Sequence, residues 1–148
     1  MAETLGSLCD KLTIVKLKQY HTEEAQKLES LGAQALQLQQ EIDEYVGNAI
    51  KGNIDPALLT FASNKVFKKE GNVIAEVKGT VAAIFSQLAD VNCRLWHEVE
   101  KGYDIENVPS AEKDALVKML AVLNLERNKC IDAIDRNFQA MVNKKNNS

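Results

Sequence analysis

A seven-residue repeat of apolar side chains is the feature that most constrains this chain. Between residues 28 and 49 the apolar positions alternate in steps of three and four, which is the spacing of one face of a helix in a bundle or coiled coil. These positions are Leu28, Leu31, Ala35, Leu38, Ile42, Tyr45 and Ala49. A second seam of the same kind contains Val77, Val81, Ile84, Leu88, Val91 and Leu95. The sequence therefore predicts long helices that pack along their length.

Glycine and proline are too scarce to punctuate many short strands. The 148 residues include seven glycines and two prolines, which disfavours a β-sandwich or barrel. A chain of this length, 45% hydrophobic, buries enough surface to fold without a disulfide or a metal. We expect an all-α protein: an antiparallel helical bundle of four to five helices, three long and one or two short. Residues 1–143 would form this single domain, and residues 144–148 a polar disordered tail.

Capping residues set the expected helix ends. The first helix is expected over about residues 4–20, and a second from residue 22 to the stop at Gly52-Asn53. A short helix follows over about 56–69, a long one over about 73–102, and a last one begins near residue 110. The expected N-caps are Thr4, Thr22, Asp55 and Ser110.

Charge and cysteine content exclude several classes of protein. The 18 basic and 21 acidic residues give a net charge of −3, without the broad basic footprint of a nucleic-acid-binding protein. No apolar run approaches the ~18 residues that cross a bilayer. Cys9, Cys93 and Cys130 are odd in number and far apart, so we expect three buried small side chains rather than disulfides or a zinc site. These features predict a cytoplasmic protein without a bound metal or cofactor.

One arginine lies on an apolar seam. Arg127 follows Leu120 by seven residues and precedes Ile134 by seven, so it occupies a position where the repeat calls for an aliphatic side chain. A buried guanidinium needs an acidic partner, because breaking such a pair costs about 3–5 kcal/mol.

The partner of Arg127 can be sought by pairing the last two long helices. If they form an antiparallel hairpin, residues lie opposite each other when their numbers sum to about 213. Glu98 is then too far along the helix to reach Arg127, and Asp10 or another acid on the first two helices is the better candidate. Asn92 and Asn124 lie within one turn of each other. We predict a polar layer of Asn92, Asn124 and Arg127 with Asp10 nearby, which either fixes the helix register or forms a binding pocket.

Other polar residues are candidates for binding. We expect Trp96 to anchor the core or its rim, with its indole N–H bonded to a carbonyl. His97 beside Glu98 is either a metal ligand, a general base or a solvated side chain. A small basic patch contains Lys65, Phe67, Lys68 and Lys69. The full set of candidate binding residues is Asp10, Lys11, Asn92, Trp96, His97, Glu98, Asn124, Arg127, Asn128, Asp132 and Asp135.

Two stretches resemble known bacterial sequences. Residues 4–18, TLGSLCDKLTIVKLK, are similar to the opening T-L-G-E-L-x-D-K-L-S-I-L-x-x-K of uncharacterised proteins often encoded beside glycosyltransferases of cell-surface polysaccharide synthesis. Residues 95–100 and 123–135 resemble an uncharacterised domain family with L-W-H-x-E-D followed by L-N-x-x-R-N-D-x-I-x-x-I-D. Here Glu100 and Lys129 replace aspartates of that pattern. The resemblance implies a helical bundle in a bacterial cytoplasm and brings no established activity.

Two functions are compatible with these features. The first is a non-enzymatic interaction or accessory factor that binds a protein partner or a second copy of itself, and the resemblance links it to surface-polysaccharide synthesis. The alternative is a metal-dependent nucleotide pyrophosphatase-like hydrolase, with carboxylates at i and i+2 or i+3 on a helix as ligands. Its candidate ligand pairs are Glu41 with Glu44, Glu98 with Glu100, and Asp132 with Asp135. Neither function involves nucleic-acid binding or membrane insertion.

Overall fold

Helices make up all the regular secondary structure that is described. The computed structural model describes residues 2–61 and 76–147. The helices are α1 (Leu5–His21), α2 (Ala25–Ile50), α3 (Val81–Tyr103) and α4 (Ser110–Asn146), with single 3₁₀ turns η1 (Pro56–Leu58) and η2 (Ile105–Asn107). The prediction of an all-α bundle is confirmed.

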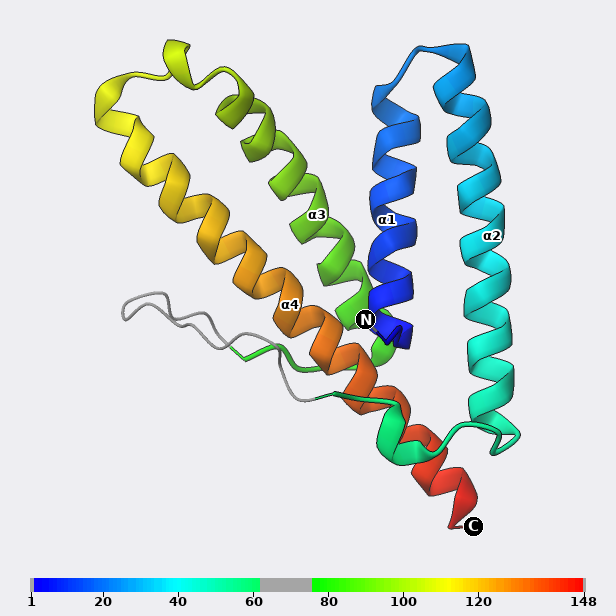
Figure 1. The fold of residues 1–148 in the computed structure, drawn as a ribbon. Coiled ribbons are helices and arrows are strands. Elements are labelled where there is room, and N and C mark those ends of the chain that lie inside the picture. Colours follow the sequence, from blue (N-terminus) through cyan, green and yellow to red (C-terminus); the bar gives the residue numbers. More distant parts are fainter. Residues whose placement is uncertain (1, 62–75, 148) are drawn as a thin grey trace.

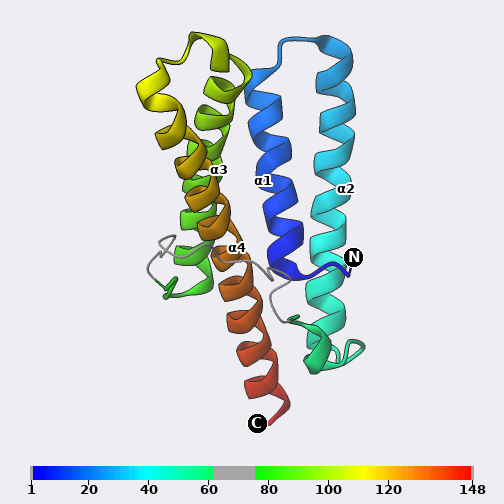
Figure 2. The same cartoon turned by 60° about the vertical axis from the view of Figure 1, so that its left-hand side comes forward.

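The helices form two antiparallel hairpins, α1/α2 and α3/α4. Helix α1 lies between α2 and the α3/α4 pair and packs against all three other helices (Figures 1 and 2). Helix α2 packs mainly on α1 and meets α4 only near its carboxyl end (Figure 1). The bundle is therefore asymmetric, with α2 as the outer helix.

The start of α1 is as predicted, but the start of α2 is not. The Thr4 hydroxyl accepts a hydrogen bond from the Ser7 N–H, and the Ser7 hydroxyl accepts one from the Thr4 N–H, which completes a capping box. Thr22 was expected to open the second helix. Its N–H instead donates to the Lys18 carbonyl and closes α1, so α2 begins three residues later with Glu24 at its N-cap.

The segment after α2 is less helical than expected. Asp55 Oδ1 accepts a hydrogen bond from the Ala57 N–H at 3.0 Å, so the predicted cap forms. The described helix that it starts is only the single 3₁₀ turn Pro56–Leu58. Residues 62–69 of the predicted helix lie outside the described residues. So does the predicted basic patch of Lys65, Phe67, Lys68 and Lys69.

Helix α3 begins later than its apolar repeat indicated. A helix from Val73 was expected, but residues 76–80 are not helical and α3 begins at Val81. Gly79 has φ = +136°, a backbone conformation that side-chain-bearing residues rarely adopt and that a helix does not contain. The Thr80 hydroxyl then caps the helix by accepting from the Ala83 N–H at 3.2 Å.

Helix α4 differs from the prediction at both ends. Ser110 is its first helical residue rather than its cap, and Pro109 takes the N-cap position. At the other end the helix continues through Asn146, so residues 144–146 of the expected disordered tail are helical. Lys145 Nζ donates to the Ile50 carbonyl at 2.6 Å and links the last turn of α4 to the end of α2.

The core has one main cluster and two smaller ones. The main cluster joins α1, the end of α2, α3 and α4, and contains Leu5, Cys9, Ala49, Leu59, Val77, Ile84, Leu88, Cys130, Ala133, Ile134, Phe138 and Val142. Between α1 and α2 a small cluster contains Val15, Leu31 and Ala35. The other small cluster, within α3/α4, contains Val91, Leu95 and Leu123. The first half of α2 is thus held by the small α1/α2 cluster.

The three cysteines do not share one environment. Cys9 and Cys130 are buried as expected, and burial raises the pKa of each thiol to about 11, which keeps the thiols protonated and unreactive at neutral pH. Cys93 is exposed, so the prediction that it is buried is wrong.

Candidate functional site

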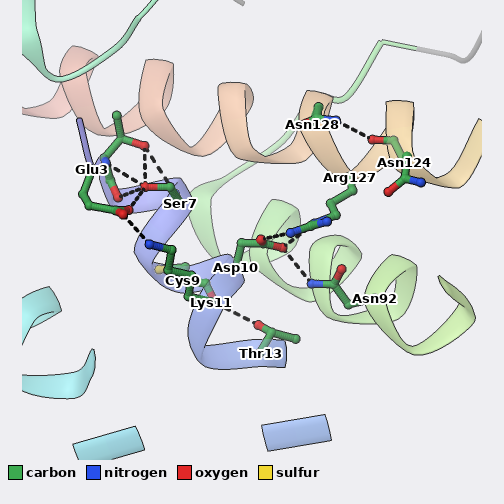
Figure 3. Close-up of polar contacts among 11 residues, drawn as sticks. Glu3, Ser7, Cys9, Asp10, Lys11, Thr13, Asn92, Asn124, Arg127 and Asn128 are labelled. Atoms are coloured by element: carbon green, nitrogen blue, oxygen red, sulfur yellow. Dashed lines mark hydrogen bonds and ion pairs between the residues drawn. The ribbon is translucent and has the colours of Figure 1, made fainter. Parts of the chain in front are cut away.

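Asp10 and Arg127 form the predicted ion pair between α1 and α4. Asp10 is 4% exposed. Arg127 Nε donates to Asp10 Oδ1 at 2.9 Å, and Nη2 donates to Oδ2, so the guanidinium binds the carboxylate through both oxygens (Figure 3). This hydrogen bonding raises the pKa of Arg127 against the opposing effect of burial. The pair joins the two hairpins in the middle of the fold.

Only one of the two predicted asparagines joins this pair. Asn92 is fully buried on α3, and its Nδ2 donates to Asp10 Oδ1 at 3.0 Å (Figure 3). Asn124 is exposed, so its predicted place in the polar layer is wrong. The Asn124 carbonyl accepts a hydrogen bond from Asn128 Nδ2 at 2.8 Å, so Asn128 also bonds within its own helix.

The register predicted for the α3/α4 hairpin is approximate, because one side-chain contact of Glu126 fits it and another, with Arg94 at 3.9 Å, is displaced by seven residues. Gln87 Nε2 donates to Glu126 Oε1 at 3.1 Å, and these residue numbers sum to the expected value. Glu98 lies far from Arg127 along the hairpin, as predicted, and pairs with Lys101 at 3.3 Å in its own helix.

A second buried carboxylate lies at the start of α1. Asp135 is 4% exposed, and its Oδ1 accepts a hydrogen bond from the Gly6 N–H at 2.7 Å. Helix α1 approaches α4 closely here, because a Cβ on Gly6 would lie 2.5 Å from the Ile131 carbonyl oxygen. Glycine at this position therefore lets the positive end of α1 face the carboxylate.

Burial controls the ionisation of Asp135. Loss of solvent raises its pKa from 3.8 to about 6, against the lowering effects of the hydrogen bonds from Gly6 and Thr4. Asp132, half-buried one turn earlier, raises this pKa slightly and Arg136 lowers it. Burial also raises the pKa of Asp132, which Arg136 opposes. The two aspartates thus share a helix face as predicted.

Trp96 connects the two hairpins near the other end of α1. Its ring stacks on the His21 imidazole with a centroid distance of 4.8 Å and an interplanar angle of 10°. The indole N–H donates to Glu100 Oε1 at 2.9 Å, so its partner is a carboxylate rather than the predicted carbonyl. No pattern in the sequence indicated this stacking of His21 on Trp96.

The remaining predicted residues lie apart from these contacts. His97 is exposed on α3. Lys11 is exposed on α1 and pairs with Glu3. Within residues 2–61 and 76–147, no group of three or more histidine, cysteine or acidic side chains is placed to hold a metal ion.

A groove runs along the α1/α2 hairpin, on the side that faces Trp96 and Arg127. It consists of three adjoining hollows with volumes of about 320, 410 and 390 Å³, which share Lys18 and Gln34 at one junction and Lys11 and Glu41 at the other. The floor is mostly apolar and includes Leu8, Ile14, Val15, Leu31 and Leu38. Besides Leu31, Leu38 and Tyr45, the α2 residues that line the groove are polar and form its wall: Lys27, Ser30, Gln34, Gln37, Glu41, Glu44 and Asn48. We call this feature the α1/α2 groove.

The α1/α2 groove has opposite charges at its two ends. Near the turn between α1 and α2, the charged lining residues are Lys18 and Lys27. At the far end they are Glu3, Glu41 and Glu44 with Lys11. Arg127 lines the middle, where Asp10 holds its guanidinium in place.

The groove was not identified from the sequence, although a signal for it exists. The polar residues of its α2 wall recur at steps of three and four, just beside the apolar seam of the same helix. Such a stripe is typical of any solvated helix face, so its spacing alone does not distinguish a groove from open surface.

Comparison of this chain with known proteins identifies no relative. No family model, curated protein or solved structure matches this chain. In the part of the chain that the structure describes, every helix is too short or too polar to span a membrane.

Proposed function

We propose that this chain is a non-enzymatic interaction protein that binds a helical segment of a protein partner in the α1/α2 groove. One observation carries the proposal: the groove follows the outer helix for most of its length, with an apolar floor between polar walls. An amphipathic helix that lies in such a groove buries its apolar face and leaves its polar face at the rim.

The dimensions of the groove fit a helix. Its α2 wall extends from Lys27 to Asn48, which corresponds to about 31 Å at ~1.5 Å per residue. The floor residues Leu31 and Val15 belong to the small cluster between α1 and α2. A helix bound above them would extend this cluster, which supports a role for the groove in binding.

The cellular setting of this function is inferred from the resemblance of residues 4–18 to proteins often encoded beside glycosyltransferases. That resemblance favours an accessory protein of surface-polysaccharide synthesis in a bacterial cytoplasm. The groove itself selects for a helix rather than for a sugar, so the partner that we propose is a protein of that system.

The alternative hydrolase function receives less support. Of its three candidate ligand pairs, Glu98 binds Lys101, Glu100 binds the Trp96 indole, and Asp135 binds the Gly6 amide. Glu41 and Glu44 are exposed side by side on the groove wall, and no third acidic or histidine ligand joins them among the described residues.

Site-specific cross-linking tests the proposal. A photoreactive residue replaces Gln34 or Gln37 in the groove, and Gln40 on another side of α2 serves as the matched control. Irradiation in cells should give a protein adduct from the groove positions and not from Gln40, and mass spectrometry identifies the adduct. The purified pair should then bind, and Leu38→Asp on the groove floor should abolish binding. Equal adducts from all three positions would contradict the proposal.

A thermal-shift screen tests the alternative. Stabilisation by Mg²⁺, Mn²⁺ or a nucleotide that disappears in Glu41→Ala, Glu98→Ala or Asp132→Ala would overturn the binding function in favour of the hydrolase. We expect no such stabilisation.

A further inference from the structure

The charge distribution of the α1/α2 groove makes it complementary to itself. Lys18 and Lys27 line one end, where Lys27 also pairs with Glu24 at 3.1 Å, and Glu3, Glu41 and Glu44 line the other together with Lys11. A rotation of 180° about an axis perpendicular to α2 exchanges these ends. It therefore brings the basic end of one groove to the acidic end of another, which is the condition for a symmetric dimer interface.

We propose that the partner helix is α2 of a second copy of this chain, which lies antiparallel to the first α2 about a two-fold axis near Gln37. This inference rests on the proposed function and names the occupant of the groove. Unlike an amphipathic helix that buries an apolar face, this occupant presents the polar wall of its own α2, because the apolar seam of α2 packs on α1. In this arrangement residues of the two copies lie opposite each other when their numbers sum to about 74.

The polar wall of α2 matches itself in that register. Gln37 lies opposite the partner's Gln37, and Gln34 lies beside the partner's Glu41. Ser30 lies beside the partner's Glu44, and Lys27 lies within one turn of that same carboxylate. Within the chain Gln37 Nε2 already donates to Glu41 Oε1 at 3.3 Å, so glutamine and glutamate on this wall bond readily.

Charged residues on α1 and just outside the two ends of α2 would also lie near opposite charges of the partner in this register. The α1/α2 pairing places Lys18 at the level of Gln34, since both line the same two hollows, and the partner's Glu41 would lie at that level. Glu23 before α2 would lie opposite the partner's Lys51 after it. A parallel arrangement would instead set Lys27 against the partner's Lys27 and Glu41 against the partner's Glu41, which like-charge repulsion disfavours.

Sedimentation equilibrium of the full chain at low salt tests this inference. We expect a dimer whose dissociation constant rises as salt is added, because the end-to-end ion pairs lie at an accessible rim. The double variant Glu41→Lys/Glu44→Lys should weaken the dimer at least about tenfold, which corresponds to ~1.4 kcal/mol. Adding Lys18→Glu and Lys27→Glu reverses both ends of the groove and should restore the dimer.

Matched variants separate the groove from general charge effects. Glu29→Lys/Asp43→Lys makes the same change in net charge on other sides of exposed α2 and should leave the dissociation constant unchanged. In a Cys93→Ser background, Gln37→Cys should form a disulfide-linked dimer on oxidation, and Gln40→Cys should not. Circular dichroism checks that each variant is folded.

The outcomes distinguish the inference from the function on which it rests. A monomer at all concentrations, or a dimer equally weakened by the two charge-reversed pairs, overturns the inference. If the photoreactive residue at position 37 then captures another protein that binds in the groove, the proposed function stands with a different partner. If it captures neither another protein nor a second copy, both fail.

Discussion

Asp10 and Asp135 are equally buried, but they are held in different ways. Asp10 lies in the middle of α1 and binds the Arg127 guanidinium through both oxygens. Asp135 lies on α4 and receives the Gly6 N–H at the start of α1. The Asp10 carboxylate is neutralised by a cation, whereas the Asp135 carboxylate accepts hydrogen bonds from uncharged donors. We expect the stability that Asp10 contributes to depend on the presence of Arg127, and the stability that Asp135 contributes to depend on pH.

Removal of the cation should have the largest effect. Arg127→Met leaves Asp10 buried and paired only with Asn92, so the free energy of unfolding should fall by about 3 kcal/mol, the lower part of the range for a broken buried pair. Urea denaturation measures this loss. The double variant Asp10→Leu/Arg127→Met should recover only part of it, because no charge then stays buried but the buried Asn92 Nδ2 loses its acceptor. An Arg127→Met protein as stable as the parent would contradict the importance of the pair.

Asp135 should make the stability depend on pH. Because its pKa is raised from 3.8 to about 6, the folded state binds a proton more tightly than the unfolded chain does. Protonation therefore stabilises the fold, and this stabilisation is lost as pH rises from about 4 to above 6. Relative to Asp135→Asn, the parent should lose roughly 2–3 kcal/mol of unfolding free energy over that range. Parallel pH curves for the two proteins would refute this assignment.

The close packing of α1 on α4 beside Asp135 can be tested by adding a side chain at Gly6. A Cβ at this position would lie 2.5 Å from the Ile131 carbonyl and 2.9 Å from Asp135 Oδ1, so Gly6→Ala should force α1 away from α4 and cost about 2 kcal/mol. Gly32→Ala is the matched control, because its nearest neighbour, Gln19 Nε2, is 4.0 Å away. That variant should be neutral or more stable by about 0.5–1 kcal/mol. Thermal denaturation compares them, and equal effects would rule out the packing explanation.

Loss of the exposed ion pair between Lys11 and Glu3 should have the smallest effect on the free energy of unfolding. Lys11 follows Asp10 and pairs with Glu3, but both side chains are open to solvent. Lys11→Ala should change the unfolding free energy by about 0.5 kcal/mol or less. A loss close to that of Arg127→Met would show that burial does not explain the difference between the two pairs.

The Asp10–Arg127 contact could be predicted because its cause is local in the sequence. Arg127 stands where the seven-residue repeat requires an apolar side chain, so its charge requires an acid. The guanidinium is less buried than predicted, because 33% of the Arg127 side chain is exposed in the groove. The failed prediction for Asn124 has a different origin. Distance along an antiparallel hairpin gives the level of a residue, but not whether its side chain is buried, and Asn124 is exposed.

Other features depend on contacts that a pattern of single residues does not record. The capping preference of Thr22 was overridden because α1 uses its N–H to close its own last turn. The apolar repeat predicts a helix that includes Val77, but residues 76–80 are not helical, and α3 begins only after Gly79, whose φ is positive. The α1/α2 groove exists because α2 packs mainly on one neighbour, and packing of whole hairpins determines that asymmetry.

The attachment of α2 also sets how the molecule fluctuates. Its carboxyl end is held by the main core through Ala49 and by the Lys145 hydrogen bond to the Ile50 carbonyl. Its first half relies on the small cluster around Leu31 and begins without a side-chain cap among the described residues. Backbone amides in the first turns of α2 should therefore exchange with deuterium before those near Ala49, by a local opening that leaves α3 and α4 closed.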